Sequence, residues 1–239
     1  MSAFDDHTTI NGYHILAQDG SDVNIPFMDD KTKTEKHDAK SFCQYHVNAL
    51  YDCLNKVFYD WSIDAASKKR EVNALISILK DRNYPKNSIF TADRGYESYN
   101  LMAHFIENDI KFVIRVKDIH TKSGLMTNIK TEEGAFDMRV NRTLTSLQTK
   151  EIKANKEKYI FVPTNPNFDF LDENRDFYDL SFRAVRFKIS EDTYETVVTN
   201  LSEDEFGTDD FKELYHYRWN EETAFNKLKY TIGLIYFHA

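Results

Sequence analysis

The carboxy-terminal stretch at residues 209–230 most constrains the fold, because its pattern is that of one long amphipathic helix. It contains neither glycine nor proline, the residues that most often end a helix. At about 100° per residue, its apolar side chains share one arc of the helix surface. These side chains are Leu214, Tyr217, Ala224, Phe225 and Leu228, and the arc continues to Ile232. The stretch therefore predicts a helix that packs one face on a core, with Thr208 or Asp209 as its N-cap.

A second arc of this helix, about 60° wide, carries a phenol, two cations and a carboxylate. We call these side chains the charged seam: Tyr215, Arg218, Glu222 and Lys229. One interpretation is a solvated face, on which the i,i+4 pair Arg218–Glu222 contributes only about 0.3–0.5 kcal/mol. The other is a site at which an acid and two cations act on phosphate. The spacing alone favours neither interpretation.

Upstream of this helix, predicted strands alternate with predicted helices. Strands are expected at 13–18, 46–54, 57–63, 88–92 and 111–116, and helices at 67–82 and 98–108. The first three strands can pair as antiparallel neighbours, whereas the later ones need helical crossovers and should be parallel. Together with the final helix, this order predicts an α/β protein of the ribonuclease-H-like type, a mixed sheet flanked by helices.

Residues 121–200 interrupt this pattern, because helical periodicity is absent there. Short alternating stretches at 136–140, 159–162, 180–187 and 194–199 indicate strands instead. We therefore predict a mainly β insertion at 121–200, placed before the last helix. The catalytic core would then comprise residues 1–120 and 201–239.

Two aspartates stand where predicted strands end. Asp19 opens Asp19-Gly20-Ser21 after the first strand, and Asp93 follows the fourth strand. Each is also typical of an ordinary turn, and the Asp-Gly pair is a common turn signal. The first and fourth strands of a ribonuclease-H-like sheet are adjacent, so the two acids would face each other with Glu222 above them. Such converging carboxylates are what two-metal phosphodiester chemistry needs.

Three motifs resemble those of bacterial insertion-sequence transposases with a DDE site. The signature Tyr-x2-Arg-x3-Glu-x6-Lys is met at residues 215–229 and is flanked by RW and LKYTIGL. The first acid motif is similar to AQDGSDVNIP, and the second is similar to TADRGYESYNL. The similarity extends from about Tyr13 to His238, nearly the whole chain.

The resemblance implies a metal-dependent DNA enzyme. Asp19, Asp93 and Glu222 would bind two Mg²⁺ (or Mn²⁺) ions that activate water to nick a transposon end, and then activate the freed 3′-hydroxyl for strand transfer. Tyr215, Arg218 and Lys229 would contact DNA phosphates, and Arg94 would add another contact. The implied partners are double-stranded transposon-end and target DNA and a second copy of the chain in a synaptic complex. Two alternatives remain open, namely a metal-dependent nuclease without strand transfer and a truncated, inactive remnant that binds DNA.

The sequence departs from the family pattern in two ways. Glu221 lies in the apolar arc of the last helix, where the family carries an aliphatic residue, and a buried unpaired carboxylate is costly. Only twelve residues precede the first predicted strand, and the chain continues ten residues past Lys229, so we expect a fragment or a truncated copy. Trp219 is open to two interpretations, and a core position is favoured over stacking on a base.

The charge distribution fits a protein that holds metal and DNA with separate surfaces. The chain of 239 residues has 31 basic and 39 acidic side chains, a net charge of −8, which by itself argues against a nucleic-acid-binding protein. Residues 111–158, however, contain 11 basic against 6 acidic side chains. Four of these, Lys150, Lys153, Lys156 and Lys158, form either a phosphate-tracking surface or a solvated face.

Cys43 and Cys53 have no zinc-site spacing. There is no signal peptide and no apolar run of about 18 residues. We therefore expect a cytoplasmic protein without a membrane partner, which the resemblance would place at a bacterial nucleoid.

Overall fold

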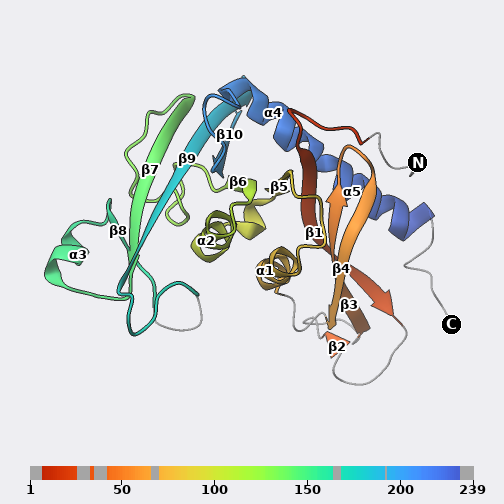
Figure 1. Ribbon diagram of the computed structural model, residues 1–239, viewed down its shortest axis with the longest axis horizontal. Coiled ribbons are helices and arrows are strands. Elements are labelled where there is room, and N and C mark those ends of the chain that lie inside the picture. Colours follow the sequence, from red (N-terminus) through yellow and green to blue (C-terminus); the bar gives the residue numbers. More distant parts are fainter. Residues whose placement is uncertain are drawn as a thin grey trace. The chain divides into compact units, whose positions relative to one another are not determined.

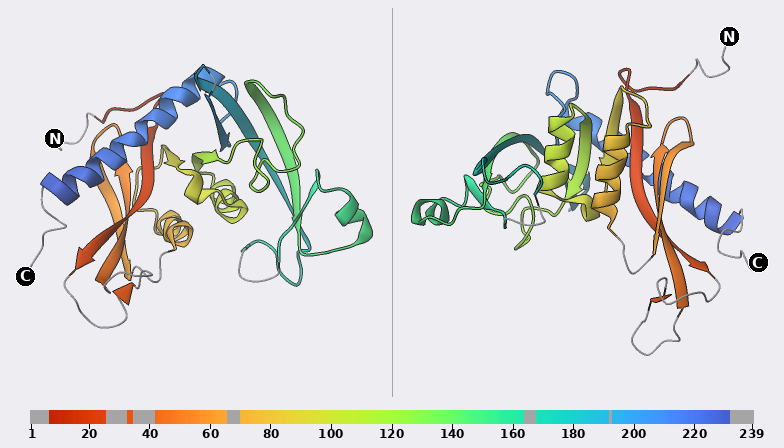
Figure 2. Two further views of the ribbon diagram at one scale, coloured as in Figure 1. Left: turned by 180° about the vertical axis from the view of Figure 1, so that it is seen from behind. Right: turned by 60° about the horizontal axis from the view of Figure 1, so that its bottom comes forward.

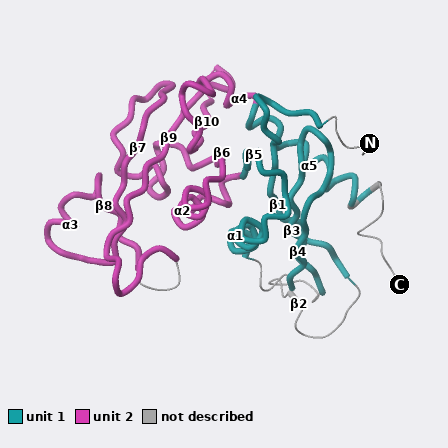
Figure 3. The backbone as a smooth tube through the Cα atoms, in the orientation of Figure 1, with its two compact units in different colours: residues 1–92, 214–239 teal, residues 93–213 magenta. Residues whose placement is uncertain are grey.

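The computed structural model describes residues 7–25, 33–34, 42–65, 70–163, 168–191 and 193–231 (Figure 1). The chain forms two compact units, which we call unit 1 (residues 1–92 and 214–239) and unit 2 (residues 93–213) (Figure 3). Unit 1 contains β1 (His14–Ile25), β2 (Lys33–Thr34), β3 (Phe42–Asp52), β4 (Val57–Ala65), α1 (Glu71–Asp81), β5 (Ser88–Ala92), α5 (Trp219–Asn226) and the π-helical segment η4 (Lys227–Thr231). Unit 2 contains η3 (Arg94–Tyr96), α2 (Tyr99–Glu107), β6 (Lys111–Val116), β7 (Phe136–Thr145), α3 (Lys150–Ala154), β8 (Tyr159–Phe161), β9 (Phe177–Ser190) and β10 (Thr193–Thr199). Helix α4 (Thr208–Tyr217) contains the boundary between the units.

The sheet of unit 1 is mixed and has the strand order β2-β3-β1-β5, with β4 also paired to β3. Strand β1 is antiparallel to β3 and parallel to β5, and Gln18 pairs with Ala92 in the parallel register. Both views of Figure 2 show β1 beside the β3–β4 hairpin. The prediction that the first and fourth expected strands are neighbours is therefore confirmed.

Strand β1 is longer than predicted, and the expected turn at Asp19-Gly20-Ser21 is wrong. The strand continues to Ile25, so Asp19 lies in its interior. Gly20 has another role there, because a Cβ atom would meet Nε2 of His46 at 2.3 Å and Oε1 of Glu71 at 2.9 Å. The glycine marks a close approach of side chains to the strand, which a glycine within a strand can also signal.

The sheet of unit 2 has the strand order β6-β10-β9-β7-β8. Strand β10 is antiparallel to both β6 and β9, and β7 is antiparallel to β9. Each of the four β stretches predicted in 121–200 is a strand, although β7 and β9 extend beyond the predicted ends. The short helix α3, capped by the Thr149 side chain, was not predicted. The predicted division into a catalytic core (1–120 and 201–239) and a β-rich insertion (121–200) concerns function, whereas the two units are defined by compactness. That division stays a prediction.

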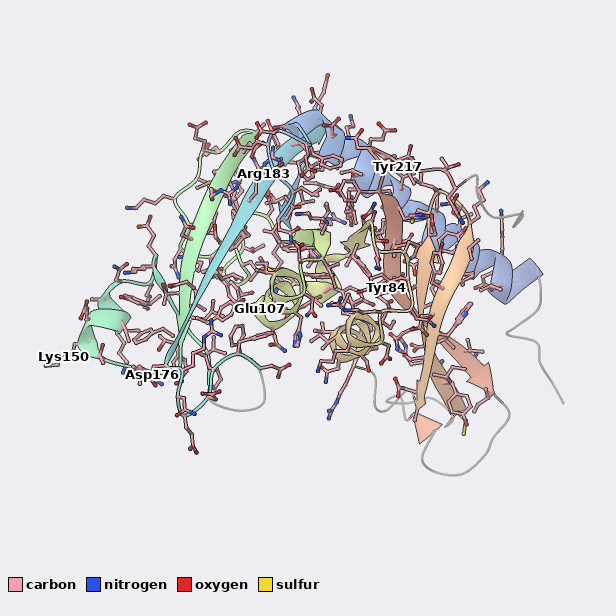
Figure 4. All side chains as sticks on the ribbon, in the orientation of Figure 1. Tyr84, Glu107, Lys150, Asp176, Arg183 and Tyr217 are labelled. Carbon is pink, nitrogen blue, oxygen red and sulfur yellow. The ribbon has the colours of Figure 1, made fainter. Side chains whose placement is uncertain are left out.

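Two buried arginines of β9 organise unit 2. The Arg183 guanidinium donates to both carboxylate oxygens of Asp137, with Nε–Oδ1 at 2.7 Å, and to the carbonyls of Ser202 and Phe206. Figure 4 labels Arg183 on β9. The Arg186 guanidinium donates to both oxygens of Asp118 at 2.8 Å. Each arginine thus joins its strand to neighbouring segments through charge-assisted hydrogen bonds.

The carboxy-terminal helix is present as predicted, but it has three consecutive parts, α4, α5 and η4. Arg218, between α4 and α5, keeps right-handed helical dihedral angles (φ −53°, ψ −35°). The predicted N-cap is wrong, because Thr208 and Asp209 lie inside α4 and the Asp210 carboxylate accepts from the Gly207 amide at 2.7 Å. Among the described residues, no helix combines the length and apolar character needed to cross a membrane.

Candidate functional site

Asp19 projects from the face of β1 that packs against α5. It is cross-strand partner to Ala49. Ala49 belongs to a buried cluster with Val23, Val47 and Phe225. Since Asp19 and Val23 are four residues apart on one strand, their side chains share this face. Helix α5, which carries Phe225, therefore lies over the strand position of Asp19.

Arg218 and Glu222 of the charged seam form an ion pair beside this face. Arg218 Nη2 donates to Oε1 of Glu222 at 2.9 Å, and its Nε donates to the Tyr215 hydroxyl at 3.1 Å. The Arg218 side chain is 2% exposed, whereas that of Glu222 is 37% exposed. The interpretation as a solvated face therefore does not hold for Arg218, because its guanidinium is buried and bonded to the Tyr215 hydroxyl.

Electrostatics connect Asp19 to the charged seam. Burial raises the pKa of the Asp19 carboxyl. The Gly20 amide, which donates to Oδ1 at 2.8 Å, and the Arg218 guanidinium oppose this rise. The nearby carboxylates of Glu71 and Glu222 add to it. Asp19 is thus a half-buried acid whose negative charge is incompletely compensated by the protein.

Glu221 is fully buried in the same region. Its exposed fraction is 0%, and within the described residues neither carboxylate oxygen has a hydrogen-bond partner. Burial raises its pKa well above the ordinary value, and the charge of Asp19 raises it further. Arg218 and the Asp19 backbone amide oppose the shift without forming a hydrogen bond of ordinary geometry. The predicted position of Glu221 in the apolar arc is therefore confirmed.

Asp93 is the first residue of unit 2 and directly follows β5, as predicted. Its Oδ1 accepts from the Arg94 amide at 2.6 Å and so caps η3. Arg115 Nη1 lies 3.8 Å from the same oxygen. The Arg94 residue is exposed. The structure thus brings Asp19 and Glu222 together within unit 1, whereas Asp93 joins them only in the proposal below.

The other members of the charged seam differ in their surroundings. Tyr215 is buried with 2% exposure, so a phosphate contact by Tyr215 or by the equally buried Arg218 stays a prediction. Lys229 lies in η4, and its side chain is outside the described part of the chain. Trp219 is 46% exposed, so the core interpretation of this residue is wrong. Its ring instead lies 4.8 Å from the Arg218 guanidinium, a cation–π contact.

A histidine network on the opposite face of β1 was not predicted. His46 is fully buried, and its Nδ1 lies 2.6 Å from Oδ1 of Asp22. Its Nε2 lies 3.3 Å from Oε1 of Glu71, the first residue of α1. The only signal in the sequence was Gly20, whose missing side chain makes room for the imidazole. The network supports the strand that carries Asp19.

The chemistry of the site fits a divalent cation. Glu222 acts electrostatically on both Asp19 and Glu221, Asp19 acts on Glu221, and the Arg218 guanidinium opposes these repulsions. Among the described residues, no three His, Cys, Asp or Glu side chains are grouped so that they could hold a metal ion. Mg²⁺ does not require such a group, because it commonly takes one or two carboxylates together with water and substrate oxygens. The unpaired oxygens of Glu221 also lack a compensating partner that a cation would supply.

Comparison with known proteins agrees with these observations. The model of the family "Transposase DDE domain" matches residues 10–238. Among solved structures, the chain is similar to the piggyBac transposase in a synaptic complex with hairpin DNA, with a TM-score of 0.50 and 9% identity. The match covers 93% of this chain and 41% of the piggyBac chain. No curated protein sequence matches. At this identity the structural likeness concerns the mixed α/β fold alone, but the family match spans nearly the whole sequence: the chain belongs to the transposase DDE domain family.

Proposed function

We propose that the chain is the catalytic domain of a DDE transposase, which cleaves DNA at transposon ends and transfers the freed 3′-hydroxyl strand into target DNA. The observation that carries the proposal is the electrostatic cluster of Asp19, Arg218 and Glu222, drawn from β1 and the carboxy-terminal helix of unit 1. Its setting in a transposase DDE domain supports the same conclusion.

Three acids are proposed for the reaction. Asp19, Asp93 and Glu222 would hold two divalent ions, Mg²⁺ or Mn²⁺, which supply activation of water and then of the 3′-hydroxyl, and stabilise the leaving oxygen. Asp93 is included because of its place in the parallel pair β1–β5. Gln18 pairs with Ala92, and the residues that follow them are Asp19 and Asp93. The two aspartates thus occupy equivalent positions after one pair of parallel neighbours.

The cations of the site have a proposed role in binding DNA. A guanidinium binds phosphate through two parallel hydrogen bonds, and Arg218 would turn from Glu222 toward such a group. Lys229 and Arg94 would add point contacts to the backbone, and the Tyr215 hydroxyl would add a hydrogen bond. These contacts position DNA without reading its bases.

The fold and the partners follow from the same proposal. The strand order β3-β1-β5 followed by the helix of the charged seam supports a ribonuclease-H-like core at 1–120 and 201–239, with a β-rich insertion at 121–200. The piggyBac structure is a synaptic complex with hairpin DNA. By analogy, we infer that this chain binds double-stranded transposon ends and target DNA as a homodimer, at the nucleoid in the bacterial cytoplasm.

Cleavage of supercoiled plasmid in Mn²⁺ tests the acids. Asp93→Asn and Glu222→Gln should each reduce nicking at least 100-fold, because each removes a ligand from the metal site. Glu203→Gln, at an exposed position, is the matched control and should cut as the unaltered chain does. If Asp93→Asn nicks normally, the acid assignment fails.

Strand transfer requires a separate measurement. A duplex that contains the DNA bordering the gene, pre-cut to expose its 3′-hydroxyl, is incubated with target plasmid. Covalent joining is the expected result. Nicking without joining would indicate a metal-dependent nuclease, and the absence of both would indicate a remnant that only binds DNA.

A further inference from the structure

Glu221 lies on the face of α5 that packs against the sheet of unit 1. It precedes Phe225 by four residues, so the two side chains lie one helical turn apart on one face. Phe225 packs against Val23, Val47 and Ala49. Ala49 is the cross-strand partner of Asp19. The packing of one turn therefore places the next turn, with Glu221, over the strand region of Asp19.

The burial of Glu221 is not explained by the protein around it. The residue is 0% exposed, and its two oxygens have no hydrogen-bond partner among the described residues. A buried polar group without a partner costs stability, and an aliphatic residue at this position would avoid that cost. The two neighbouring side chains on this face, Ala224 and Phe225, are buried and apolar. The carboxyl group is therefore an exception within an apolar surface.

Glu221 is electrostatically coupled to Asp19. Of the charged groups that influence Glu221, Asp19 has the largest effect, ahead of Arg218 and Glu222. The Arg218 guanidinium donates from Nη2 to Glu222 and from Nε to Tyr215, and among the described residues no hydrogen bond reaches the Glu221 oxygens. Two neighbouring carboxyl groups repel when both are ionised. A divalent cation between them would relieve the repulsion and satisfy the unpaired oxygens.

We propose that Glu221 is a fourth metal-binding carboxylate of this domain, which shares a divalent cation with Asp19 on the buried side of the site, while Glu222 binds at the exposed rim. The inference rests on the proposed function, because it takes Asp19 as a ligand. It differs from that function in the residue it adds. The ligand class is a hard divalent cation, Mg²⁺ or Mn²⁺, which prefers carboxylate oxygens.

Calorimetric titration of the 239-residue chain with Mn²⁺ in the absence of DNA tests the assignment. Glu221→Gln keeps the shape of the side chain and removes its charge, so the Kd for Mn²⁺ should rise at least tenfold. Circular dichroism establishes that the variant is folded. Glu203→Gln, an exposed change elsewhere, should bind Mn²⁺ as the unaltered chain does. An unchanged Kd for Glu221→Gln overturns the inference.

A second variant separates a ligand from a poorly placed core residue. Glu221→Leu should raise the melting temperature in EDTA by about 2–4 °C or more, because an apolar side chain suits the buried position. Added Mn²⁺ should raise the melting temperature of the unaltered chain more than that of Glu221→Leu, because the variant keeps the other proposed ligands but binds the ion more weakly. If Mn²⁺ stabilises both chains equally, Glu221 is only a costly core residue and the inference is wrong.

The outcome for Asp19 distinguishes the two proposals. If Asp19→Asn weakens Mn²⁺ binding while Glu221→Gln does not, the proposed function stands and the further inference fails. If neither Asp19→Asn nor Glu222→Gln changes Mn²⁺ binding, or the unaltered chain binds no Mn²⁺, both fail.

Discussion

Unit 2 contains buried ion pairs whose charges compensate each other, whereas unit 1 contains two carboxyl groups whose charges are only partly compensated. In unit 2, Arg183 and Arg186 are almost fully buried, and each binds both oxygens of one aspartate. Hydrogen bonds from these arginines lower the pKa of Asp137 and lower that of Asp118 to about 2. In unit 1, burial raises the pKa of Asp19 and Glu221, and in the part of the chain that the structure describes the Glu221 carboxyl group has no hydrogen-bond partner.

This difference separates charges that stabilise the fold from charges that are available for function. A carboxylate with both oxygens engaged by arginine has its compensation within the protein, and losing that partner is costly. A carboxylate with a raised pKa has been desolvated without full compensation. Such groups gather at functional sites, where an external cation or substrate completes the charge balance.

The largest effect is expected when the comparison is tested at Asp19. Asp19→Asn should reduce Mn²⁺-dependent plasmid nicking by roughly 1000-fold or more, because it removes a proposed metal ligand. Its free energy of unfolding in EDTA should stay equal or rise, because a desolvated charge is removed. Nicking assays and urea unfolding measure the two quantities. A strong loss of stability would place Asp19 with the structural acids of unit 2.

The corresponding change in unit 2 should affect stability instead. Asp137→Asn leaves the buried Arg183 guanidinium without its carboxylate and should lower the free energy of unfolding by about 2–4 kcal/mol. Urea unfolding measures this change, with the exposed Glu203→Gln as the control. Mn²⁺ binding should remain as in the unaltered chain. A neutral effect on stability would show that the carbonyls of Ser202 and Phe206 suffice to hold Arg183.

A smaller effect is expected where unit 1 relies on close packing. Gly20→Ala should destabilise the chain by about 1–3 kcal/mol, because the added Cβ would meet His46 Nε2 at 2.3 Å and must displace the ring. Differential scanning calorimetry measures the change. Gly134→Ala is a matched control, since a Cβ there meets no atom within 4 Å. Equal melting temperatures for the two variants would contradict the packing argument.

The smallest effect concerns pH. Because the pKa of Asp118 is lowered from 3.8 to about 2, its contribution to stability is present above pH 4 and is lost as the pH falls toward 2. The Asp118 side chain is about one-third exposed, so solvent screening limits this contribution to about 1–2 kcal/mol. Urea unfolding at pH 4 and pH 2 should show a smaller acid-dependent decrease for Asp118→Asn than for the unaltered chain. Identical decreases would contradict the assignment.

Local sequence patterns were enough to predict most of the strands and helices and the residue types of the site. Apolar periodicity predicted the strands at 88–92 and 111–116 with their observed ends, and the carboxy-terminal helix with Glu222 beside its apolar face. These features depend on interactions between residues close in the chain, or on which face is apolar. They can therefore be predicted from the local sequence pattern.

Which buried charges find a partner could not be predicted, because it depends on tertiary contacts. The Asp19-Gly20 pair looked like a turn, and its place inside β1 depends on pairing with β3 and on the imidazole of His46, which comes from a distant segment. The sequence likewise does not show that the buried Arg183 has a carboxylate partner, or that the Glu221 oxygens have no hydrogen-bond partner among the described residues. Whether a buried charge meets a partner depends on contacts between residues far apart in the chain, and those contacts exist only once the sheets and helices have packed.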